Sequence, residues 1–180
     1  MYTRKFQYPG ILAALFLALA IAGCEKDSST EQELITTLVV HLKATDGSFD
    51  QEFTWEDRDG DGGNAPTVGD ILLPANKTFH AHIHFYDRSQ SPEVDITAEV
   101  EGENTAHLLV YTVSGANLNI TPDDTDDNGK PFRLETTWTT GAASNGTVKV
   151  TLRHEPDKNA ANPDITGDVD AEASFVVKVE

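Results

Sequence analysis

Apolar and polar residues alternate along several short runs of the chain after residue 34. In one run, Val148, Val150 and Leu152 alternate with Lys149 and Thr151, which gives one apolar and one polar face. This period of two is typical of an antiparallel β-strand with one buried side. Similar runs, separated by Gly, Asn, Asp and Pro, predict strands at residues 34–44, 48–56, 78–86, 96–101, 107–113, 118–121, 133–140, 147–154 and 174–179.

Roughly eight or nine strands of this length predict an all-β fold, an antiparallel two-sheet sandwich of immunoglobulin-like type. A closed barrel is the alternative. Small residues at 142–146, ending in Asn145-Gly146, predict a hairpin between two long strands. No internal repeat is long enough to indicate a solenoid.

The N-terminus has the order of chemical zones that is typical of a secretory signal. Arg4 and Lys5 are followed by an almost purely apolar run at 11–21. That run is roughly a dozen residues long, short of the ~20 needed to span a bilayer as a helix. The sequence Ile21-Ala22-Gly23-Cys24 resembles the lipobox cut by bacterial lipoprotein signal peptidase. We therefore expect a lipid on Cys24.

This interpretation divides the chain into a signal peptide at 1–23, a flexible tether with the lipidated Cys24 at 24–33, and a β-sandwich domain at 34–180. The expected location is the outer membrane, on the cell-surface or periplasmic face. Cys24 is the single cysteine of the chain, so the domain has no disulfide.

The mature chain is strongly acidic. Removing Arg4 and Lys5 from 13 basic residues leaves 11 against 30 acidic residues, a formal charge of −19. Nucleic acid is an implausible partner, because its phosphates require Lys and Arg. An acidic surface keeps the protein soluble and raises the local concentration of cations.

Two segments carry aspartates at alternate positions before a glycine. In the first, Asp57, Asp59 and Asp61 precede Gly62 and Gly63. Alternate carboxylates on a tightly turned backbone converge on one point, as hard cations such as Ca²⁺ require. The Gly63 carbonyl, Asp70 or a residue from elsewhere in the chain could complete the set. The twelfth position of an EF-hand loop would be Val68, so a true EF-hand is excluded.

The second segment repeats the spacing with Asp124, Asp126 and Asn128 before Gly129. We expect Ca²⁺ or another structural divalent cation at these loops. The alternative is that Asp, Asn and Gly here only form turns.

Three histidines, His80, His82 and His84, alternate with apolar residues along one predicted strand. They would share one face, with neighbours about 6.5–7 Å apart, close enough for two imidazoles to bind one Zn²⁺ or Cu²⁺ ion. His41 or His107 on a neighbouring strand could add a ligand. The alternative is an exposed polar face without a metal.

Enzyme signatures are absent from the sequence: it has no GxSxG, HExxH, P-loop or GxGxxG motif. We expect no catalytic residues. A zinc-dependent hydrolase that uses the three-histidine strand is the alternative.

Together with the lipobox, four further segments carry a resemblance: DGDGGNAP at 59–66, YTVSGA at 111–116, TTGAAS at 139–144 and LRHEP at 152–156. They resemble a family of small, largely uncharacterised lipoproteins of Bacteroidota, over nearly the whole mature chain. Some members are labelled as a type 1 periplasmic binding fold, which needs two α/β lobes and disagrees with the strand pattern. Members are often paired with TonB-dependent receptors, which implies a role beside an uptake channel.

The sequence thus favours a membrane-anchored, cation-stabilised binding or accessory module. The alternative is a structural or adhesive surface domain in which the calcium loops only stabilise the fold.

Overall fold

The computed structural model describes residues 34–60 and 62–180. The expected signal peptide and tether, with Cys24, and Asp61 of the first aspartate loop lie outside the described residues. Within them, no helix is both long and apolar enough to cross a membrane.

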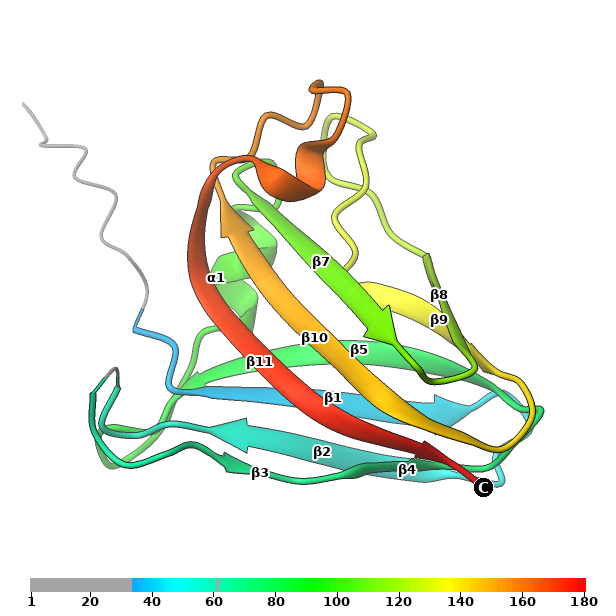
Figure 1. Cartoon of the computed structure of the whole chain (residues 1–180). Coiled ribbons are helices and arrows are strands. Elements are labelled where there is room, and N and C mark those ends of the chain that lie inside the picture. The colour runs from blue at the N-terminus through cyan, green and yellow to red at the C-terminus, as the bar shows by residue number, and fades with distance from the viewer. Residues whose placement is uncertain (1–33, 61) are drawn as a thin grey trace, which may run out of the picture. The chain divides into compact units, whose positions relative to one another are not determined.

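Strands dominate the described part of the chain, with one α-helix and one 3₁₀ helix (Figure 1). In order the elements are β1 (Thr37–Ala44), β2 (Asp50–Glu56), β3 (Thr67–Val68), β4 (Ile71–Leu73), β5 (Thr78–Asp87), β6 (Val94–Asp95), α1 (Thr97–Gly102), β7 (His107–Ser114), β8 (Leu118–Pro122), β9 (Glu135–Thr140), β10 (Ser144–His154), η1 (Pro163–Ile165) and β11 (Asp168–Val179).

The strands form two sheets. The larger sheet has the order β3-β2-β1-β5-β9-β8, with β6 paired to β5, and the smaller has the order β4-β11-β10-β7. Pairing is antiparallel except between β4 and β11, which run parallel. The predicted all-β sandwich is therefore confirmed.

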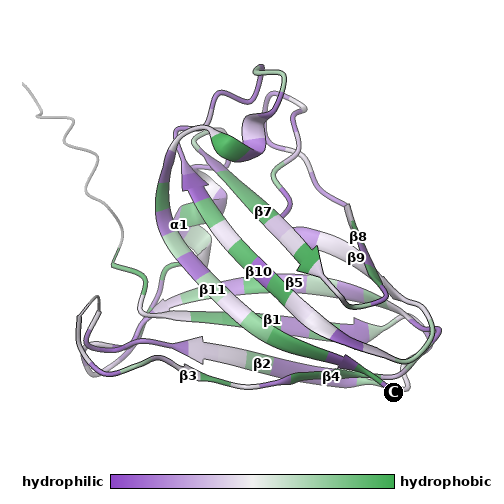
Figure 2. Cartoon of the chain, in the orientation of Figure 1, coloured by the Kyte–Doolittle hydropathy of each residue, from purple (hydrophilic) through white to green (hydrophobic). Residues whose placement is uncertain are grey.

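The core lies between the inner faces of the two sheets, and the period of two decides which residues it contains. On β5, Phe79, Ala81, Ile83 and Phe85 are buried, and on β10 Val148, Val150 and Leu152 are buried. Figure 2 shows the same alternation of apolar and polar residues along β10 and β11. The largest fully buried side chain is Trp138 of β9.

One predicted strand is wrong: residues 97–102 form helix α1 rather than part of a strand at 96–101. Ile96 and Val100 are both buried, and a spacing of four places them on one side of a helical turn. The Asp95 carboxylate accepts a hydrogen bond from the Thr97 amide at 2.9 Å. This bond satisfies one of the amides that the first turn of a helix leaves without an intrahelical partner.

The predicted hairpin at 142–146 is also wrong, because β9 belongs to the larger sheet and β10 to the smaller one. The segment therefore carries the chain from one sheet to the other. Gly146 lies inside β10, where a Cβ atom would stand 2.1 Å from the Ala116 amide nitrogen and 2.2 Å from the Ser114 carbonyl oxygen. Glycine is required here by close backbone approach and not by a turn.

Replacing Gly146 with alanine should destabilise the fold by about 1–3 kcal/mol, because the new methyl group must displace backbone atoms of residues 114–116. Urea unfolding measures the change. Gly102→Ala is the matched control, since nothing lies within 4 Å of its added Cβ. The control should change stability by less than about 1 kcal/mol. Equal stability of the two variants would contradict the close approach at β10.

Candidate functional site

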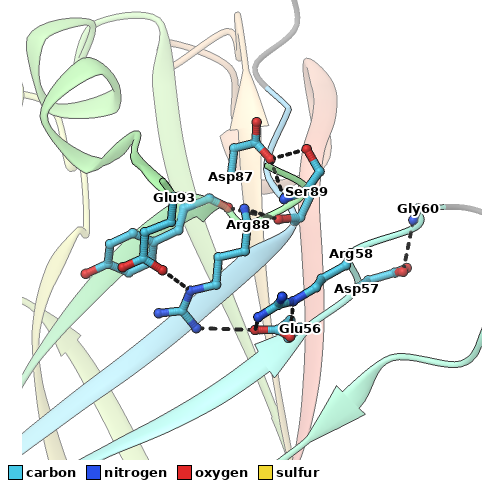
Figure 3. Close-up of polar contacts among 10 residues, drawn as sticks. Glu56, Asp57, Arg58, Gly60, Asp87, Arg88, Ser89 and Glu93 are labelled. Atoms are coloured by element: carbon cyan, nitrogen blue, oxygen red, sulfur yellow. Dashed lines mark hydrogen bonds and ion pairs between the residues drawn. The ribbon is translucent and has the colours of Figure 1, made fainter. Parts of the chain in front are cut away.

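The first aspartate loop joins β2 to β3 and is shaped by its own carboxylates. Asp57 Oδ1 accepts a hydrogen bond from the Gly60 amide at 3.0 Å, as Figure 3 shows. Asp59 Oδ2 accepts from the Asn64 amide at 3.0 Å and from Asn64 Nδ2 at 2.6 Å, and these bonds lower the pKa of Asp59. A Cβ at Gly63 would lie 2.4 Å from Asp59 Cγ, so a larger residue there would displace the Asp59 carboxylate.

A chain of ion pairs fixes the base of this loop (Figure 3). Arg58 Nε lies 2.6 Å from Glu56 Oε1, Arg88 Nη1 lies 3.3 Å from Glu56 Oε2, and Arg88 Nε lies 2.6 Å from Glu93 Oε2. Hydrogen bonds from Arg58 and then Arg88 lower the pKa of Glu56. The positive charge of Arg58 is thus held by Glu56 rather than by Asp57 or Asp59.

A cleft of about 890 Å³ with polar and apolar walls borders the loop. Its walls include Trp55, Asp57, Asp59 and Asn64 from the β2 side, and Asp170 and Glu172 from β11. The cleft also borders residues 34–36, where the described chain begins. Among the described residues, four carboxylates and one guanidinium, that of Arg58, line the cleft, so its charged lining is mainly acidic.

The second aspartate loop joins β8 to β9 and is built differently. Asp124 accepts hydrogen bonds from the Arg133 and Glu135 amides. Asp126 Oδ1 accepts from the Asn128 amide at 2.9 Å and from the Lys130 amide at 2.8 Å. Asp126 Oδ2 lies 2.9 Å from Lys158 Nζ, with the two side chains 1% and 7% exposed. Both oxygens of Asp126 therefore have partners from the chain itself.

The two loops differ in whether a positively charged side chain pairs with their aspartates. Lys158 supplies an ammonium group to Asp126 in the second loop. Within the described residues, no ion pair to Lys, Arg or His reaches Asp57 or Asp59 in the first. The structure accounts for the buried carboxylate of the second loop without a metal ion, and calcium binding by either loop stays a prediction.

The three-histidine strand is β5, and its histidines point away from the core as the sequence predicts. Ring centroids are 4.5 Å apart for His82 and His84 and 6.2 Å apart for His84 and His41 of β1. Burial, followed by the charges of His82 and His41, lowers the pKa of His84. His80 stands apart, 70% exposed, with Nδ1 3.9 Å from Asp123 Oδ2.

Three histidines of this face, His41, His80 and His82, each lie within 4.0 Å of a carboxylate. His41 Nε2 lies 2.6 Å from Asp50 Oδ1, and His82 Nδ1 lies 3.5 Å from Glu135 Oε1. The expectation that His107 could join this row is wrong, because β7 belongs to the other sheet. Binding of Zn²⁺ or Cu²⁺ by His80, His82 and His84 stays a prediction.

A different cluster meets inside the sandwich. Among the described residues, His107, His154 and Asp170 are the group of His and acidic side chains whose ligand atoms all lie within 4.8 Å of one another. Two imidazoles and a carboxylate can hold a transition-metal ion or form a buried ionic network. Sequence reasoning missed the group, because no motif links three residues that lie on three different strands.

Comparison with known protein families, with curated proteins and with solved structures finds no match to this chain. Its class is therefore defined by its own fold and polar groups: an acidic two-sheet β-sandwich that concentrates carboxylates and imidazoles at a few defined places.

Replacing Asp126 with asparagine should destabilise the fold by about 3–5 kcal/mol, because the buried Lys158 ammonium loses its counter-charge. Asp46→Asn, at the exposed ion pair with Lys77, is the control and should cost no more than about 1 kcal/mol. Urea unfolding at neutral pH compares the two variants. A similar small loss in both would contradict the structural role of the buried pair.

The buried Asp126–Lys158 pair also predicts how the stability of the fold depends on pH. Burial acts to raise the pKa of Asp126, but hydrogen bonds from Lys158 and from the Lys130 and Asn128 amides lower it further than burial raises it. Its contribution to stability is complete above the ordinary pKa of about 4 and is lost as the pH falls through the lower folded value. Asp126→Asn should lose this part of the acid sensitivity.

Proposed function

We propose that this protein is an exported lipoprotein, held at the outer membrane by a lipid on Cys24, whose β-sandwich is a cation-stabilised binding or accessory module. The lipobox-like residues 21–24 and the apolar run before them support export and lipidation. The charge of −19 on the mature chain supports cation binding at its surface.

The cleft beside the first aspartate loop is the observation that carries this proposal. The loop brings Asp57 and Asp59 to one wall, and β11 brings Asp170 and Glu172 to another. Carboxylate oxygens are the ligands that hard cations prefer, and no ion pair in the described residues neutralises the two loop aspartates. This loop is therefore the better calcium candidate of the two.

A position beside a TonB-dependent uptake receptor is part of the proposal. The support for it is the resemblance to Bacteroidota lipoproteins, since such proteins are often paired with these receptors. Within that arrangement the tether holds the sandwich at the membrane, and the cleft samples the surrounding solution.

Replacing Cys24 with alanine should move the protein from the outer-membrane fraction to the soluble periplasmic or secreted fraction. Without the thiol no lipid can be attached, and the apolar run at 11–21 is too short to anchor the chain. Cell fractionation and metabolic labelling with a clickable fatty acid measure location and lipidation. Label on the Cys24→Ala protein, or its retention in the outer-membrane fraction, would contradict lipid anchoring.

Calcium should raise the melting temperature of the chelator-treated, detergent-solubilised lipoprotein, because a ligand that binds the folded form alone stabilises it. At 100 times the dissociation constant the gain is about 2.7 kcal/mol. Asp59→Asn should abolish the shift, whereas Asp46→Asn, in an exposed ion pair away from the loop, should keep it. The absence of a shift with Ca²⁺ or Mg²⁺ would contradict the calcium hypothesis. It would not bear on the lipid anchor, which the Cys24→Ala experiment tests separately.

A further inference from the structure

His107, His154 and Asp170 are brought together by strand register in the smaller sheet. β7 and β10 are antiparallel, and His107 lies directly opposite His154. The residues that share the inner face with them, Leu109, Val150 and Leu152, are fully buried. The period of two that builds the core therefore turns both imidazoles inward at the end of the sheet.

Asp170 reaches this inner position because of a β-bulge. Leu152 pairs with Ala171, and Arg153 pairs with Val169, so Asp170 is an extra residue on β11 with no partner across the ladder. A bulge of this kind re-aims a side chain, and bulges are frequent beside functional sites. The Asp170 side chain is 2% exposed, and those of His107 and His154 are 1% and 14% exposed.

The spacing of the three groups fits a shared metal ion. Asp170 Oδ2 lies 3.4 Å from His107 Nε2 and 3.5 Å from His154 Nδ1. Two ligands that each lie ~2.1 Å from a tetrahedral zinc ion are roughly 3.4 Å from each other. N–H···O hydrogen bonds are usually 2.7–3.2 Å long, so these separations match co-ligands better than hydrogen-bonded partners.

Asp170 itself adds an independent observation. Its Oδ2 atom is buried and makes no hydrogen bond within the described part of the chain. A buried carboxylate oxygen without a hydrogen bond is costly unless a cation compensates it. In the described part of the chain, the ion-pair partners of Asp170 are the imidazoles of His107 and His154, so these and a bound cation are the groups that could compensate it.

We propose that His107, His154 and Asp170 bind one divalent first-row transition-metal ion, with Zn²⁺ as the representative. Nitrogen ligands exclude Ca²⁺ and Mg²⁺ as the preferred ion, since these ions take oxygen ligands. Three protein ligands leave a fourth position for water or a small ligand. An ion could reach the site from the cleft that borders Asp170, or past the partly exposed His154. This site needs neither the calcium loop nor the lipid anchor.

The test is a Zn²⁺ titration of the full, EDTA-treated lipoprotein in detergent, in competition with a chromophoric chelator. Wild type should bind one tight equivalent, and His154→Gln and Asp170→Asn should bind it at least about 100-fold more weakly, because loss of even an outer partner of a ligand costs 10–100-fold. His82→Ala is the matched control, since it removes a histidine of the surface row and should keep the tight site.

Circular dichroism in EDTA shows whether each variant folds. If a variant does not fold, a measurement on the wild type still tests the proposal. Co²⁺ added to the wild-type protein should give a visible d–d absorption that one equivalent of Zn²⁺ removes. No tight zinc and no such absorption in the wild type would overturn the proposal and leave a buried imidazole–carboxylate network. Tight binding that survives in His154→Gln and disappears in His82→Ala would move the site to the surface row.

Discussion

The alternation of side chains along each strand is the constraint on which both the core and the polar clusters depend. On β5 the even positions His80, His82 and His84 face outward because the odd positions fill the core. On β10 the parity is reversed, so the face that buries Val150 and Leu152 continues inward to His154. The same rule thus places one set of histidines in water and the other inside the sandwich.

The strands were predictable from the sequence where this alternation is long and regular. β5, β7 and β10 lie within a few residues of their predicted positions because each presents an uninterrupted apolar face. Helix α1 was not predictable, since six residues are too few to show a helical period. The crossing from β9 to β10 was missed because partner strands are chosen by non-local packing, while Asn145-Gly146 suits both a turn and a close approach.

The candidate sites depend on contacts between residues far apart in the sequence, which local sequence patterns do not predict. Two loops of nearly the same sequence pattern differ because Lys158, far along the chain, neutralises Asp126 in one of them. The inward group needed the register of three strands and a bulge, neither of which any sequence motif records. Without the bulge, the alternation of β11 would turn Asp170 to the side opposite Ala171, away from both imidazoles.

A high negative charge and a buried imidazole pair have different consequences for cations. The surface carboxylates act over a distance of about one Debye length, ~8 Å at physiological salt, and attract cations by charge without regard to their preferred ligands. Selection between cations requires short-range chemistry, and in this chain imidazole nitrogens beside a carboxylate occur both on the outer face of β5 and between β7, β10 and β11. On the outer face, water competes for the ion and the side chains are free to rearrange. Between the sheets, the backbone ladders fix the donor atoms before any ion arrives, so less conformational entropy is lost on binding. Pre-organisation therefore favours the inner group as the more selective of the two, although the outer row is the one that the sequence displays openly.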